Sequence, residues 1–148
     1  MNNIIKVILD IKNIFRVVSF FIALKWIFNL FYCFIDILKK RNLEPADIKM
    51  GNGPFKVRRG KAIANLSGHQ IFSGIREIWI RDCYLYRNIL EFNDNGLVVD
   101  LGANIGVFTQ LALASNDTNR VIALEPNKML INDLVVSVQR NNWQERLK

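Results

Sequence analysis

The residues whose types and spacing could do chemistry lie around a glycine-bracketed turn in the last third of the chain. An apolar run, 97–101, carries an acidic residue near its end and leads into the turn, and a second apolar run, 120–124, is followed by another carboxylate. A strand, a glycine turn, a helix and a second strand followed by a carboxylate form half of a nucleotide-binding βαβ unit. The candidate ligand-binding residues are Asp100, Gly102, Asn104, Gly106 and Glu125.

Each of these residue types has a physical reason to lie near a ligand. Glycine lets the backbone approach a bound molecule closely, and the amides at the start of the following helix face a polar or anionic group. A carboxylate after the second strand, here Glu125, takes the place where ribose hydroxyls are bound in such folds. The pattern therefore predicts a site for a nucleotide or a nucleoside.

The spacing of the glycines argues against a dinucleotide. In a GxGxxG fingerprint that starts at Gly102, Asn104 stands where the second glycine would admit the pyrophosphate, and Val107 stands at the third position. The sequence also lacks the lysine of a Walker-type phosphate loop here. S-adenosylmethionine is the favoured ligand, because its carboxypropyl arm and ribose need amides and carboxylates rather than a phosphate cradle. A fragment that binds NAD is the weaker alternative.

Two stretches of the sequence resemble a known enzyme family. The run Val98–Thr109, VVDLGANIGVFT, and the run Val121–Asn127, VIALEPN, are similar to the first two motifs of FkbM-type S-adenosylmethionine-dependent methyltransferases. Upstream, Ile75–Tyr84 is similar to the segment that precedes the methyltransferase core in that family. The resemblance extends from Gly51 to the C-terminus and leaves out the apolar N-terminal segment.

The resemblance implies an α/β protein with a Rossmann-like methyltransferase core that O-methylates a hydroxyl of a sugar or another metabolite. S-adenosylmethionine would be the cofactor, and Glu125 would accept hydrogen bonds from its ribose hydroxyls. The methionine side of the cofactor would be lined by Asp100, Gly102, Asn104 and Gly106. The acceptor would be a small molecule or a glycan, and no residue is assigned as a catalytic base.

The resemblance also implies that the sequence covers only part of a methyltransferase core. The sequence reaches Lys148 where a third strand is due, so we expect a C-terminally truncated core, the N-terminal part of a methyltransferase. Parts that bind the adenine and most of the substrate would follow. Whether the chain is an enzyme is therefore open, and the alternative is a non-catalytic truncated remnant or a membrane-associated interaction module.

Composition shifts divide the chain into three parts. Residues 97–148 are predicted to form the first βαβα of the methyltransferase domain, with Asn127 as the N-cap of the second helix. Residues 42–96 are predicted to be a linker and a small α+β segment. Residues 1–41 form a hydrophobic, amphipathic part of their own.

The middle part carries two further local patterns. A hairpin is predicted around Arg59-Gly60-Lys61, and the alternation of Ile78 and Ile80 with charged neighbours suggests a half-exposed strand. The charged residues of this stretch are either substrate contacts or a solvated face: Glu77, Arg81 and Asp82.

The N-terminal part is predicted to be one helix from Ile4 to Leu38, uninterrupted by glycine or proline. Its polar stripe is narrow, and its apolar side is wide and aromatic. Lys25 opposes a transmembrane span, because a central lysine costs about 3 kcal/mol on insertion scales. The sequence favours a peripheral membrane contact through residues 4–41, with Lys39-Lys40-Arg41 as the anchor. Packing against protein is the first alternative, and a membrane-spanning helix is the least favoured one.

Composition narrows the remaining function classes. The chain has 148 residues, 51% hydrophobic and 22% charged, which is typical of a globular protein. Its net charge is +7, but the basic clusters are not interleaved with aromatic residues, so no nucleic-acid partner is expected. Cys33 and Cys83 have no metal-ligand spacing, so no metal site is expected, and two lone thiols fit a cytoplasmic location, with or without peripheral contact at the membrane.

Overall fold

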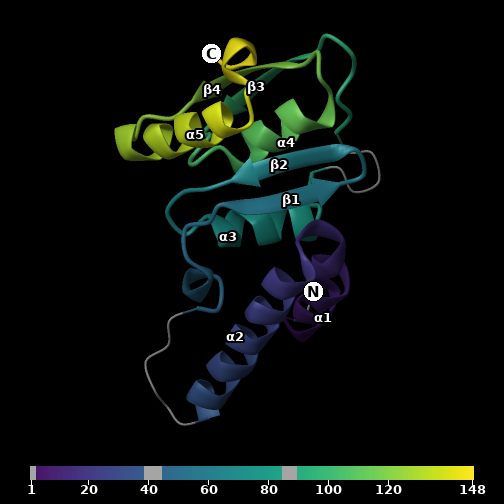
Figure 1. Cartoon of the computed structure of the whole chain (residues 1–148), viewed down its shortest axis with the longest axis vertical. Coiled ribbons are helices and arrows are strands. Elements are labelled where there is room, and N and C mark those ends of the chain that lie inside the picture. The colour runs from purple at the N-terminus through teal and green to yellow at the C-terminus, as the bar shows by residue number, and fades with distance from the viewer. Residues whose placement is uncertain (1–2, 39–44, 85–89) are drawn as a thin grey trace.

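The computed structural model describes residues 3–38, 45–84 and 90–148, and it is a mixture of helices and two small sheets. The basic run Lys39-Lys40-Arg41 lies outside the described residues. Figure 1 shows the elements stacked along the longest axis, with the N-terminal helices at one end, a hairpin in the middle and a parallel strand pair at the other end.

The C-terminal layer is built on two parallel strands, as the sequence predicts. β3 (Leu97–Leu101) pairs in register with β4 (Arg120–Leu124), and α4 (Val107–Ser115) is the crossover between them. α5 (Lys128–Arg140) follows, and Asn127 is its N-cap, because its side chain accepts a hydrogen bond from the Met129 amide at 3.0 Å. The predicted strands, their order and this cap are confirmed.

The parallel pair is covered on one face and extended at one edge. Leu97, Val99 and Leu101 are exposed on the face away from α4. After the short helix η4 (Gln144–Arg146), Lys148 exchanges hydrogen bonds with Val121 and Ala123 of β4. This segment pairs in parallel on the edge of β4 opposite β3, since alternate residues of a strand bond to opposite neighbours.

The middle of the molecule is the predicted hairpin. β1 (Phe55–Arg59) and β2 (Ala62–Leu66) are antiparallel and joined through Gly60, whose φ is +57°. Side chains of α5 and of its C-cap Asn141 bond to the backbone at the end of the hairpin: Ser137 Oγ accepts from the Ser67 amide at 3.0 Å, and Asn141 Oδ1 accepts from the Asn65 amide at 2.8 Å. The hairpin is thus fastened to the parallel layer.

The strand predicted around Ile78 is wrong, because this stretch is helical. After the short helices η1 (Ile48–Met50) and α3 (Ile71–Gly74), a π-helix, η2, runs through Ile75–Ile80. The buried residues there recur at helical spacing: Ile71, Phe72, Ile75, Trp79 and Ile80. An alternation of two isoleucines is too short to distinguish a strand from this pattern.

The prediction of a single N-terminal helix is wrong in one respect: the segment is helical, but it forms two helices. α1 (Asn3–Val17) and α2 (Phe20–Leu38) are separated at Val18-Ser19. The Ser19 carbonyl accepts the hydrogen bond of the Ala23 amide at 3.0 Å, so Ser19 stands at the start of α2. Serine favours this position, and two β-branched valines precede it.

Both N-terminal helices pack on the same core as the hairpin. The largest fully buried side chains include Trp26, Phe72 and Trp79, and the ring of Phe72 lies 6.4 Å from Trp26 and 5.2 Å from Phe55. One cluster of buried side chains extends from Ile14 in α1 to Leu111 in α4. Residues 3–38 and 45–84 therefore do not form separate cores.

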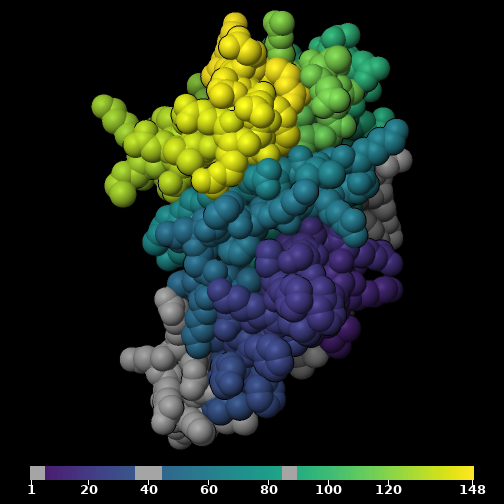
Figure 2. Space-filling view, in the orientation of Figure 1, coloured from purple at the N-terminus to yellow at the C-terminus, as the bar shows by residue number. Residues whose placement is uncertain are grey.

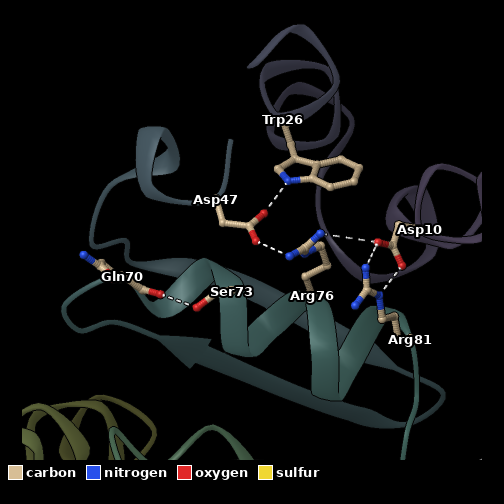
Figure 3. Close-up of polar contacts among 7 residues, drawn as sticks. All are labelled: Asp10, Trp26, Asp47, Gln70, Ser73, Arg76 and Arg81. Atoms are coloured by element: carbon tan, nitrogen blue, oxygen red, sulfur yellow. Dashed lines mark hydrogen bonds and ion pairs between the residues drawn. The ribbon is translucent and has the colours of Figure 1, made fainter. Parts of the chain in front are cut away.

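Buried charges fasten these helices to η2 (Figure 3). Asp10, which is fully buried, accepts hydrogen bonds from Arg81 Nε at 2.8 Å and Arg81 Nη2 at 2.6 Å. Arg76 lies between Asp10 and Asp47, with its Nη2 2.7 Å from Asp47 Oδ2. Trp26 Nε1 donates to the other oxygen of Asp47 at 2.7 Å. The hydrogen bond with Asp10 raises the pKa of Arg81, as expected for a matched pair.

Neither N-terminal helix, nor any other helix in the described ranges, has the length and apolar character needed to cross a bilayer.

Replacing Arg81 with methionine should destabilise the protein. The substitution leaves the fully buried Asp10 with only the longer contact to Arg76, and breaking such a pair costs about 2–3 kcal/mol when the arginine is partly exposed. Arg58→Met, at an exposed position of β1, is the matched control and should cost less than about 0.5 kcal/mol. Urea unfolding followed by circular dichroism measures both, and equal losses would contradict the assigned role of Asp10.

Candidate ligand-binding site

The glycine turn is a tight loop held by left-handed backbone. Between β3 and α4, Gly102, Asn104 and Gly106 have φ values of +76°, +53° and +79°. Glycine adopts this conformation without steric cost, and asparagine tolerates it better than most residues. The turn therefore bends sharply enough to bring the chain from the end of β3 directly into α4.

The amides of the turn all bond within the protein. The amides of Gly102 and Ala103 donate to the Leu124 carbonyl at 2.8 and 3.0 Å, and the Gly106 amide donates to the Ala103 carbonyl at 2.8 Å. The Asn104 amide donates to Glu125 at 2.9 Å, and the Ile105 amide to the Asn104 side chain at 2.8 Å. The turn is therefore preorganised, and its amides do not form an open cradle for a pyrophosphate.

Glu125 joins the ends of the two strands. Its Oε2 accepts from the Asn104 amide in the turn, and its Oε1 accepts from the Asn127 amide at 3.0 Å, before α5. Each carboxylate oxygen can accept further hydrogen bonds. Glu125 can thus position the turn and still bind hydroxyl groups of a ligand.

Asp100 is nearly buried at the end of β3, with 9% of its surface exposed. Its Oδ2 accepts a hydrogen bond of 2.5 Å from the Thr109 hydroxyl in α4. This bond fixes the carboxylate against the first turn of the helix. The same side chain lines the pocket described next.

A pocket of about 270 Å³ lies between the glycine turn and the η2 segment. From the turn it is lined by Asp100, Gly102 and Asn104, and from the other side by Glu77 and Tyr84. Of the predicted site residues, the structure thus brings three into one lining. Gly106 and Glu125 are outside it: Gly106 faces Leu134 in α5, and Glu125 reaches the pocket only through its bond to Asn104.

The far wall of the pocket depends on a second close contact, between Gly74 and α4. A Cβ atom at Gly74 would lie 2.8 Å from Cγ2 of Val107, so the absence of a side chain lets η2 lie against α4. This contact places Glu77 and Tyr84 beside the turn. From the sequence, Glu77 could be either a substrate contact or part of a solvated face, and Tyr84 was not predicted as a site residue. The ring of Tyr84 lies 4.8 Å from that of Phe108. The contact distance of Gly74 could not be read from the sequence.

The charged residues near Glu77 have other partners. Arg81 bonds to Asp10, and Asp82 pairs with Arg59 of the hairpin. Neither is in the pocket lining, whereas the exposed Glu77 is. Of the three residues that the sequence offered as substrate contacts or a solvated face, only Glu77 is therefore placed to contact a ligand here.

The pocket has an acidic and aromatic character. Partial burial raises the pKa of the Tyr84 phenol, and the nearby Glu77 and Asp100 raise it further, so the phenol is protonated at neutral pH and can donate a hydrogen bond. The described lining residues include two carboxylates and no lysine, arginine or histidine. Such a lining favours a cationic group and opposes an anionic one.

A larger hollow of about 740 Å³ lies at the other end of the strands, lined by residues such as Asn95, Leu97 and Arg120. Ligands of open parallel sheets bind outside the carboxyl ends of the strands, which is where the glycine turn lies. We therefore take the smaller pocket as the candidate site.

Comparisons with known proteins do not place the chain in a group: it has no significant match among family models, curated proteins or solved structures.

The two glycines of the turn should respond differently to alanine. At Gly106 a Cβ atom would lie 2.5 Å from Leu134 Cγ, so overpacking adds to the strain of a positive φ, and we expect a loss of at least about 3 kcal/mol. At Gly102 a Cβ atom meets nothing within 4 Å, so only the backbone strain of about 1–2 kcal/mol applies. Guanidinium unfolding measures the two variants, and equal losses would contradict the close packing of Gly106.

Proposed function

We propose that the chain binds S-adenosylmethionine in the pocket beside the glycine turn and belongs to a methyltransferase of the FkbM type. The observation that carries the proposal is the chemistry of the pocket: carboxylates of Asp100 and Glu77 in a lining without a described cation. S-adenosylmethionine has a net positive charge, because its ammonium and sulfonium groups outnumber its one carboxylate, and its two positive groups are complementary to these side chains. A dinucleotide would bring a pyrophosphate to a turn whose amides are already bonded.

The order of the strands around the pocket supports the same proposal of a methyltransferase core. β3, α4 and β4 form a parallel βαβ unit, and the Lys148 segment pairs beyond β4, away from β3. The strands then succeed one another outward from β3, as in the first half of a Rossmann-like sheet. In this proposal β3 is the first strand of a methyltransferase core.

Each residue then has a role that its contacts permit. Asp100 and Glu77 hold the ammonium group of the methionine portion, and Gly102 leaves the space that this portion fills, since nothing lies within 4 Å of its missing Cβ. Glu125 accepts hydrogen bonds from the ribose hydroxyls while it holds the turn through the Asn104 amide. Gly106 acts indirectly, by letting α5 pack against the turn.

The reaction that the cofactor supplies is methyl transfer to a nucleophilic oxygen. When bound, S-adenosylmethionine would supply an activated methyl group to the acceptor hydroxyl of a sugar or metabolite, with S-adenosylhomocysteine as the leaving group and the hydroxyl proton going to a base. The protein's contribution is to hold donor and acceptor in line. No described residue is assigned as that base.

Isothermal titration calorimetry should show binding of S-adenosylmethionine and S-adenosylhomocysteine and none of NADH. The acidic lining and the bonded amides explain this preference. Gly102→Ala, which places a methyl group in the open space of the pocket, should weaken binding beyond its effect on folding. NADH binding without S-adenosylhomocysteine binding would overturn the proposal and favour the dinucleotide alternative.

Glu125→Gln should weaken S-adenosylhomocysteine binding by about tenfold or more, because hydrogen bonds to a charged group contribute about 1.5–3 kcal/mol. Glutamine keeps one acceptor oxygen but sets its NH2 group against one of the two backbone amides that Glu125 accepts from, so amide exchange at Asn104 and Asn127 checks that the turn persists. Glu145→Gln, at an exposed position of η4, is the matched control and should leave affinity unchanged. Unchanged affinity in Glu125→Gln would remove the ribose assignment.

A further inference from the structure

The outer faces of α1 and α2 form a large exposed apolar surface, which we call the aromatic surface. Its members share an exposed, apolar or aromatic side chain: Ile8, Leu9, Ile11, Phe15, Phe20, Phe21, Phe28, Phe31, Tyr32 and Phe34. Phe21 is 81% exposed, and the four other phenylalanines of α2 are each 58% or 59% exposed. Contiguous apolar patches on soluble monomers are rarely extensive, so such a surface indicates an interaction site.

The aromatic surface is continuous across the break between the helices. The ring of Phe15, near the end of α1, lies 5.9 Å from that of Phe20, and Phe20 lies 5.9 Å from Phe21. Farther along α2, Phe31 and Tyr32 lie 6.3 Å apart. The two helices, which lie at the purple end of the molecule in Figure 2, thus present one surface.

Polar contacts on the opposite side of the two helices fix the orientation in which the aromatic surface is exposed. Asp10 and Trp26 face η2 and the Asp47 carboxylate, and the Asn13 side chain donates to the Ile80 carbonyl at 3.3 Å. A surface helix of a soluble protein normally places its polar stripe in solvent and its apolar stripe inward. Here much of the polar stripe is used for docking, so rotating the helices to hide the aromatic rings would unpair Asp10.

The charges on the same two helices identify the occupant. Among their described side chains, every exposed charged residue is cationic: Lys12, Arg16 and Lys25. The one described acidic side chain, Asp10, is buried and paired. A second copy of this surface would bring like charges together, whereas an anionic bilayer supplies both an apolar interior and negative headgroups.

We propose that the aromatic surface inserts into the interface of an anionic lipid bilayer, with α1 and α2 lying along the membrane rather than crossing it. The aromatic rings enter the headgroup and acyl boundary, and Lys12 and Arg16 extend to the phosphates, whereas Lys25 donates to the Met50 carbonyl. The inference goes beyond the proposed methyltransferase function and does not depend on it, because the two sites share no residue.

Flotation of the whole protein with vesicles tests the proposal. The protein should float with vesicles of phosphatidylcholine and phosphatidylglycerol, and much less with phosphatidylcholine alone. Phe21→Glu with Phe28→Glu should lower partitioning by at least about tenfold, since each buried phenylalanine contributes about 1.5–3 kcal/mol. Both positions are exposed, so circular dichroism and the melting temperature should remain those of the wild type.

Matched substitutions on α5, which lies at the opposite end of the molecule in Figure 1, are the controls. Met129→Glu with Val136→Glu exchanges two exposed apolar residues there and should leave flotation unchanged. Lys12→Glu with Arg16→Glu should reduce binding by about tenfold or more, at about 1 kcal/mol per cation, and Lys128→Glu with Arg140→Glu should reduce it less.

Three outcomes would overturn the proposal. One is equal flotation of the wild type and the Phe21→Glu, Phe28→Glu variant, and another is equal flotation with and without phosphatidylglycerol. The third is a wild type that does not float but is dimeric by light scattering and becomes monomeric in that variant, which would assign the surface to a second copy.

Discussion

The arrangement of this molecule depends on a carboxylate that has no access to water. Asp10 is fully buried, and an unpaired charge in that position would be very costly, so α1 must lie where two arginines of the η2 segment reach it. The η2 segment also forms the far wall of the pocket. The same short π-helix therefore fixes the position of the N-terminal helices and forms one side of the candidate site. The N-terminal helices that carry the aromatic surface and the candidate ligand pocket thus both depend on this one segment.

The pocket depends on two glycines that permit close approach between elements. Gly74 lets η2 lie against Val107 of α4, and Gly106 lets the turn lie against Leu134 of α5. Around these contacts the turn bonds all its own amides, and Glu125 connects it to the end of β4. A ligand therefore meets a preformed surface, in which the carboxylates of Asp100 and Glu77 are the available charges.

The sequence predicts what depends on local chemistry and fails where distant segments decide. The hairpin at Gly60, the two parallel strands and the Asn127 cap follow from turn residues and apolar periodicity, and they are confirmed. The π-helix at 75–80 and the helix break at Ser19 were not predicted, because an alternation over two residues and an uninterrupted apolar run are ambiguous. A helical periodicity also identifies a polar stripe without saying what it faces, so the burial of Asp10 is visible only in three dimensions. The assignments to S-adenosylmethionine and to the FkbM family stay predictions.

The ion pair between Asp10 and Arg81 joins residues 71 positions apart in the chain. During synthesis α1 and α2 leave the ribosome well before the arginines that fix them, and closing so long a loop adds to the entropy that docking must overcome. Until then, Asp10 lacks the arginines that pair with it, although Asp47 is already available to Trp26. For that interval a nascent chain carries the unpaired carboxylate of Asp10 and the exposed aromatic surface on the same two helices.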